Sequence, residues 1–125
     1  MANNGFAKFA ALSGFVAVLL GAFGAHSLKA IFTDYQMGIW QTAVFYQFIH
    51  TVVLLVVSQI SVVDVNRKLF KTVCFCFVMG ICFFSFSLYF LAIFSIKWLG
   101  IITPVGGVFL LMAWLLLFVL FKKGN

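Results

Sequence analysis

The stretch LGIITPVGGVFLLMAWLLLFVLF, residues 99–121, decides the fold class of this chain. It contains no charged residue and is long enough to cross a bilayer as a helix, which takes about 20 mostly apolar residues. Three similar stretches precede it, at about residues 6–26, 38–60 and 69–94. Each should be helical, because backbone groups left unpaired in lipid are too costly. The sequence therefore predicts an all-α membrane protein with four transmembrane helices in a compact bundle.

The composition agrees with a protein that lipid surrounds. Of the 125 residues 66% are hydrophobic and 8% are charged, and the mean hydropathy is +1.24. Soluble domains are roughly 45–50% apolar and about 25% charged. The connections between the apolar stretches are too short for a soluble domain. We therefore expect a single transmembrane domain over residues 1–125.

The net charge of +6 comes from basic residues that stand between the apolar stretches. They form no basic stripe, so we exclude nucleic acid as a partner. With four spans, both termini and the loop from Ser61 to Lys68 lie on one side, and the other side holds only Lys29 and Lys97. The first side has Lys8, Arg67, Lys68, Lys71, Lys122 and Lys123. Basic residues gather on the cytoplasmic side of membrane proteins, which predicts cytoplasmic N- and C-termini. The loop also holds Asp64, and acidic residues contribute little to this rule.

The first stretch has an alternative interpretation as a cleaved signal peptide. A basic residue, an apolar run and the small residues 21, 22, 24 and 25 are typical of one. We favour a retained span, because the run is long and small residues recur along it in steps of three and four. They are Ala7, Ala10, Gly14, Ala17, Gly21 and Gly24. Such a stripe predicts close packing against another helix, either in the same chain or in a second copy.

The second span carries a polar face. Gln36, Trp40, Ala43, Gln47 and His50 share one side of the helix, with Tyr46 and Thr51 beside it. Polar side chains are costly against acyl chains, so we expect this face to point into the bundle.

The neighbouring spans offer partners and anchors for that face. Ser85 and Tyr89, one turn apart on the third span, are the expected partners. Tyr35, Trp40 and Trp98 are expected at the membrane interface, where aromatic residues gather. Trp114 lies deeper in its span and is expected to pack.

The fourth span begins with a Thr-Pro-Val-Gly-Gly run. Thr103 is expected to cap a helix whose first position is Pro104, with residues 97–103 as a turn. Gly106 and Gly107 would then allow a neighbouring helix to approach closely.

Residues that bear cofactor or catalytic chemistry are few. His26 and His50 lie at different depths, so they are badly placed as a haem pair, and no Cys/His spacing is typical of zinc. Cys74, Cys76 and Cys82 are expected to fill apolar space. The four stretches contain no Asp or Glu, and a Ser85–His50 nucleophile pair is less expected than hydrogen bonds between helices. We therefore predict no cofactor, no metal site and no enzyme activity.

Four ordered motifs resemble a known family. They are GAFGAH at 21–26, WQTAVFYQFIH at 40–50, FSFSLY at 84–89 and LGIITPVGG at 99–107. The chain resembles the family named domain of unknown function 423, except that Phe86 stands where the family usually has Gly. The resemblance implies a multi-pass, four-helix protein of the bacterial inner (plasma) membrane. It implies no reaction, because the family has no assigned activity.

These observations favour a structural or accessory component of a membrane complex. The alternative is a small oligomeric transporter or channel, with a polar path lined by the second helix. Besides the lipid bilayer, the expected partners are further copies of the chain or other membrane proteins. The candidate functional or packing residues are His26, Trp40, Gln47, His50, Ser85, Tyr89, Thr103, Pro104, Gly106 and Gly107.

Overall fold

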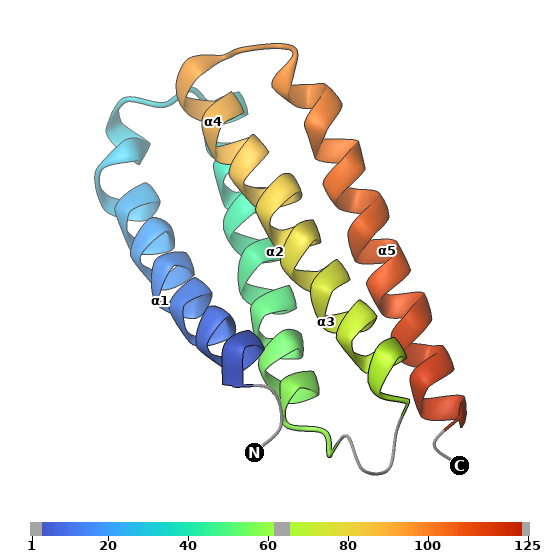
Figure 1. Ribbon diagram of the computed structural model, residues 1–125. Coiled ribbons are helices and arrows are strands. Elements are labelled where there is room, and N and C mark those ends of the chain that lie inside the picture. Colours follow the sequence, from blue (N-terminus) through green and yellow to red (C-terminus); the bar gives the residue numbers. More distant parts are fainter. Residues whose placement is uncertain (1–3, 62–65, 124–125) are drawn as a thin grey trace.

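A computed structural model describes residues 4–61 and 66–123, and it confirms the four predicted spans (Figure 1). The third span is built from three consecutive helical segments, the middle one a π-helix that we label η2. The elements are α1 (Asn4–His26), the 3₁₀ turn η1 (Leu28–Ala30), α2 (Asp34–Ser58), α3 (Arg67–Gly80), η2 (Ile81–Phe86), α4 (Ser87–Phe94) and α5 (Leu99–Lys123). Asp64 lies outside the described residues.

Local capping sets where the second and third spans begin. Thr33 Oγ1 accepts a hydrogen bond from the Gln36 backbone N–H, and the Gln36 side chain accepts one from the Thr33 N–H. This reciprocal capping box makes α2 begin at Asp34, four residues before the predicted start at 38. Asn66 caps α3 by accepting from the Leu69 N–H at 3.0 Å.

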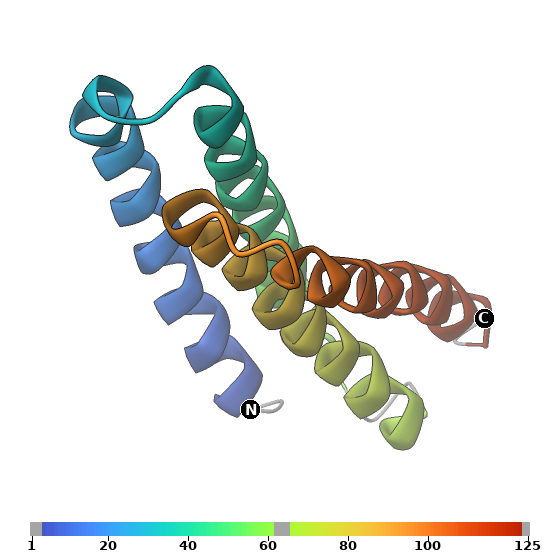
Figure 2. The ribbon, with the colours of Figure 1, turned by 90° about the horizontal axis from the view of Figure 1, so that it is seen from above.

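The helices form an open bundle with α1 and α5 on its two flanks (Figure 2). α1 packs on α2, α5 packs on the third span, and α2 contacts the third span along its length. Both ends of the described chain lie at the same end of the bundle as the end of α2 and the start of α3 (Figure 1). Outward-facing side chains on the flanks are large and apolar, as in Phe15 and Leu111, which are 66% and 73% exposed. Lipid is the environment that suits such a surface.

The small-residue stripe of α1 faces α2 of the same chain. Ala10 and Ala17 are buried, and a Cβ added at Gly24 would lie 2.7 Å from Cδ1 of the Trp40 indole. At Gly21 an added Cβ would lie 3.3 Å from Val44 Cγ1. The stripe therefore serves packing within one chain, which the sequence left open.

The predicted helix cap at Thr103 is wrong, whereas the predicted beginning of the fourth span at residue 99 is confirmed. α5 begins at Leu99, Pro104 lies inside it, and Thr103 is no cap, since its hydroxyl donates to the Leu99 carbonyl at 3.4 Å. Bonds between residues three apart satisfy the backbone N–H groups of Leu99, Gly100 and Ile101 before Pro104 is reached. A proline within the first two turns of a membrane helix is tolerated, because other groups satisfy the freed backbone. The turn is therefore residues 95–98 rather than 97–103.

Trp40 is also misplaced by the sequence prediction. It is 3% exposed and sits in the bundle, whereas Tyr35 near the start of α2 and Trp98 in the turn before α5 are 76% and 60% exposed. Because α2 begins earlier than predicted, Trp40 stands nearly two turns inside it rather than at its edge.

Candidate functional site

A buried hydrogen-bond network joins three helices around Gln47, which is fully buried. The Tyr89 hydroxyl of α4 donates to Gln47 Oε1 at 2.6 Å. Gln47 Nε2 donates to the Ser13 carbonyl of α1 at 3.1 Å and lies 3.3 Å from Ser13 Oγ. Ser13 Oγ in turn bonds Thr51 Oγ1, one turn along α2, at 2.7 Å. One amide thus links α1, α2 and α4 at a single level.

The predicted polar face of α2 points into the bundle along its length. Nearer the start of α2, Gln36 Nε2 donates to the Ala92 carbonyl of α4 at 3.0 Å. Trp40 Nε1 donates to the Leu20 carbonyl of α1 at 3.0 Å, and its ring meets that of Tyr89 edge-on at 4.7 Å. We name the set of Ser13, Gln36, Trp40, Gln47, Thr51, Ser85 and Tyr89 the polar seam.

Ser85 belongs to the polar seam because its side chain bonds a backbone carbonyl of α2. Its hydroxyl donates to the Ala43 carbonyl at 2.9 Å from within η2, so it does not pair with His50. On the opposite side of η2, a Cβ added at Gly106 would lie 2.6 Å from Phe83 C and 2.7 Å from Phe84 Cα. The π-helical turn is therefore in backbone contact with α5 at Gly106. At Gly107 the nearest atom would be 3.8 Å away, so only Gly106 serves the predicted close approach.

His50 has a partner on each ring nitrogen. Its Nδ1 lies 2.7 Å from the Tyr46 carbonyl, which only accepts, so Nδ1 carries the proton. Its Nε2 accepts from the Trp114 indole N–H at 3.1 Å. The imidazole is therefore neutral in this arrangement, and neither nitrogen is free to bind a metal. Trp114 packs as predicted, and its hydrogen bond to His50 joins α2 to α5.

The remaining sequence-predicted residues lie apart from the seam. Thr103 Oγ1 and Ser87 Oγ are 2.7 Å apart, which joins α5 to α4 near their connection. Pro104 and Gly107 line a groove of about 430 Å³ beside His50, between α2 and α5. His26 is exposed at the end of α1 and joins no described network.

Two further observations describe the interior. Within residues 4–61 and 66–123, no buried side-chain nitrogen or oxygen lacks a hydrogen-bond partner. Over the same residues, no three His, Cys, Asp or Glu side chains gather closely enough to hold a metal ion. The cysteines that the structure describes are free thiols, of which Cys74 and Cys76 are buried. The buried side-chain nitrogen and oxygen atoms that the structure describes are thus already paired.

Fold and seam together define a small multi-pass membrane protein whose helices are joined by neutral hydrogen bonds. Comparison with known families matches residues 20–107 to the family described as protein of unknown function DUF423. The chain belongs to this family, which confirms the resemblance seen in its sequence motifs.

The relatives are bacterial membrane proteins. The chain is 44% identical to a UPF0382 membrane protein of Staphylococcus epidermidis over 108 residues, 86% of each chain. It is 39% identical to the UPF0382 inner membrane protein YgdD of Escherichia coli over 111 residues, 89% of this chain and 84% of YgdD. It is 37% identical to YwdK of Bacillus subtilis over 109 residues. The predicted location in the bacterial inner (plasma) membrane is confirmed. No solved structure matches the chain.

Proposed function

We propose that this protein is a structural or accessory component of a membrane complex and not an enzyme. The observation that carries the proposal is the full pairing of the buried polar groups. Hydrogen bonds between helices fix how the helices pack in lipid, which is what a structural role needs. In the polar seam, the amide of Gln47 and the hydroxyls of Ser13, Thr51 and Tyr89 bond one another in this way.

The same pairing weighs against the transport alternative. Gln47 and His50, the residues that would line a path along α2, point at partners on α1, α4 and α5. The chain has two acidic residues, Asp34 at the first position of α2 and Asp64 outside the described part, so the described interior offers no carboxylate to couple ions. A path would have to run between copies of the chain.

An accessory role instead uses the outer faces of the bundle. α1 and α5 present large apolar side chains on opposite flanks, including Phe15 on α1 and Leu115 on α5, 66% and 64% exposed. A partner helix can pack on either flank without disturbing the seam, because no seam residue lies on these outward faces.

The test is photocrosslinking in native membranes at physiological expression. A photoreactive amino acid replaces Phe15, Leu115 or, as a buried control, Ala43, which is 0% exposed. We expect one defined protein to crosslink in stoichiometric yield from one flank only, and to co-purify with the unmodified chain. Crosslinks only to lipid, or to many proteins in proportion to their abundance, would overturn the proposal. So would an ion or solute flux through purified protein in liposomes that Gln47→Leu abolishes while the helical content is retained.

A further inference from the structure

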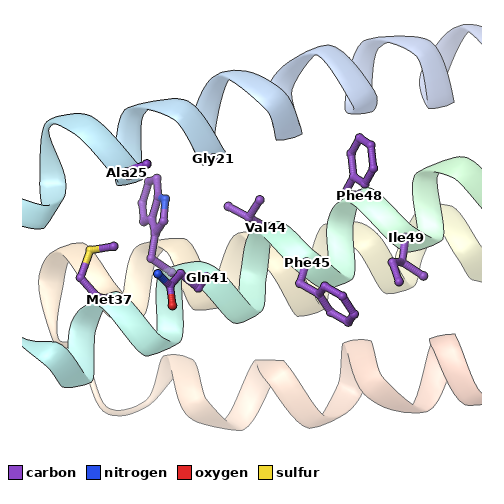
Figure 3. A pocket seen from close by; sticks show the side chains of 10 residues that line it. Gly21, Ala25, Met37, Gln41, Val44, Phe45, Phe48 and Ile49 are labelled. Atoms are coloured by element: carbon purple, nitrogen blue, oxygen red, sulfur yellow. The ribbon is translucent and has the colours of Figure 1, made fainter.

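The end of the bundle opposite the termini carries an apolar groove that continues into a charged pocket. The groove has a volume of about 540 Å³ and lies between α1 and α2. In Figure 3 the side chains of Met37, Val44 and Phe48 stand on the side of α2 that faces α1. The pocket has a volume of about 460 Å³ and contains Lys29 and Asp34. Ala25, Met37 and Gln41 line both, so the two form one continuous surface.

We propose that this surface binds one phospholipid that carries a phosphate and a free ammonium, as phosphatidylethanolamine does. One acyl chain lies in the α1/α2 groove, and the headgroup lies in the pocket, with its phosphate at Lys29 and its ammonium at Asp34.

The length of the groove argues for an acyl chain. Along α2 it runs from Met37 to Ile49, which is about 18 Å at the helical rise per residue. One leaflet of a bilayer with a hydrocarbon core of about 30 Å is about 15 Å deep. A transmembrane partner helix would need contact across both leaflets, whereas this groove follows only one. The length of the groove along α2 therefore matches a lipid tail better than a transmembrane partner helix.

The pocket argues for the headgroup. Lys29, in η1, and Asp34, at the start of α2, are both exposed, and within the described residues neither forms an ion pair. They supply one positive and one negative charge at the mouth of an apolar groove. A phosphate with a primary ammonium complements both charges, and that ammonium can donate charge-assisted hydrogen bonds to a carboxylate. Phosphatidylglycerol lacks the ammonium, and the methylated ammonium of phosphatidylcholine has no N–H to donate.

Gln41 lies where groove and pocket meet. Its side chain is exposed and has no hydrogen-bond partner within the part of the chain that the structure describes, unlike the buried Gln47. Helical side chains lean toward the N-terminus, so the amide of Gln41 leans from α2 toward the Asp34 end. The glycerol esters of a lipid lie between headgroup and tail, so a Gln41 N–H placed here can donate to an ester carbonyl.

The experiment is native mass spectrometry of the detergent-purified full chain after equilibration with equal amounts of three lipids. These are phosphatidylethanolamine, phosphatidylglycerol and phosphatidylcholine with identical acyl chains. We expect one retained lipid per chain, with phosphatidylethanolamine preferred about two- to fivefold, the effect of one exposed ion pair. Asp34→Asn should remove this preference and keep lipid retention. Lys29→Gln should lower retention of all three, while Lys97→Gln, in the connection at the same end of the bundle, should not.

A groove variant tests the tail site. Ala25→Phe fills the junction of groove and pocket, and Ala22→Phe places the same side chain on the exposed face of α1 outside both. Only the first should lose the bound lipid, and circular dichroism with gel filtration confirms that both variants are folded. If Ala25→Phe proves unfolded, Ala25→Leu is measured in its place. Three results would overturn the proposal. They are equal retention of the three lipids, a bound lipid that Ala25→Phe retains as well as Ala22→Phe does, and a dimer that holds no lipid.

Discussion

Replacing Gln47 by Leu should destabilise the bundle far more than its single lost amide suggests. The side chain is fully buried and Leu has a similar size, so the change is mainly in hydrogen bonding. Gln47 loses its bonds to two residues, the one that Oε1 accepts from the Tyr89 hydroxyl and the pair that Nε2 donates to Ser13. Hydrogen bonds between membrane helices average about 0.6 kcal/mol each. The Tyr89 hydroxyl, in a residue that is 4% exposed, would also be left without its acceptor, which costs about 1–3 kcal/mol. Together these give a loss of about 2–4 kcal/mol.

The double variant Gln47→Leu with Tyr89→Phe gives the sharper result. Removing both partners leaves no unpaired hydroxyl, and such paired replacement is close to neutral when shape is kept. We therefore expect the double variant to be more stable than Gln47→Leu alone, and within about 1 kcal/mol of the parent chain. Gln41→Leu is the matched control, because that neighbouring glutamine has no described partner, and it should change stability by less than about 0.5 kcal/mol.

The assay is reversible unfolding in mixed micelles, followed by helical circular dichroism and tryptophan fluorescence. The parent chain, Gln47→Leu, Tyr89→Phe and the double variant form a double-mutant cycle, and they are measured with the Gln41→Leu control at one detergent composition. Two results would refute the reasoning. One is a Gln47→Leu chain as stable as its parent, and the other is a double variant whose loss equals the sum of the two single losses.

Three further predictions use the same preparations. Gly106→Ala should lower the free energy of unfolding by about 1–3 kcal/mol, because the added Cβ meets backbone atoms of Phe84. Gly107→Ala is the control and should leave this free energy unchanged, and equal effects of the two substitutions would contradict the packing. Trp114→Phe removes the hydrogen bond to His50, so in the same unfolding assay it should cost about 0.6–1.7 kcal/mol more in the parent chain than in a His50→Ala background, and equal losses in both would contradict the assignment. Mass spectrometry of the chain from membranes should find the first span retained, and loss of about the first 25 residues would show instead that this span is a cleaved signal.

Periodicity predicted much of the seam. The spacing of Gln36, Trp40, Gln47 and His50 identifies one face of α2, and lipid is a poor solvent for that face, so its direction into the bundle followed from the sequence. Tyr89 was recognisable because it was among the few polar residues on the next span. Ser13 was missed, although it stands within the small-residue stripe between Ala10 and Ala17. A serine among alanines and glycines has the size of a packing residue, and its hydroxyl gives no periodic signal of its own.

Residue preferences misplaced the cap of the fourth span, although the apolar stretch predicted that α5 begins at residue 99. Thr103-Pro104 has the pattern of a cap and a first helical position, and capping preferences come largely from helices whose ends meet water. Here the polypeptide turns at residues 95–98, and Ser95 adopts a left-handed conformation with φ of 53° that ends α4. Hydrogen bonds between backbone groups three residues apart then form the first turn of α5. Where the turn lies depends on packing between α4 and α5, such as the Ser87–Thr103 contact, which no local pattern encodes.

The distribution of paired and unpaired polar groups connects the two proposals. Apolar packing alone gives helices little reason to associate in one register within lipid, because the acyl chains are equally apolar. The neutral bonds of the polar seam supply that register. In the accessory role proposed above, recognition then occurs at the surface. The unpartnered Gln41 amide, the Lys29 ammonium and the Asp34 carboxylate gather at one end of that surface, at the mouth of a groove one leaflet deep. A bound lipid there would lie beside the α1 flank, where it could shape the surface that a partner protein meets.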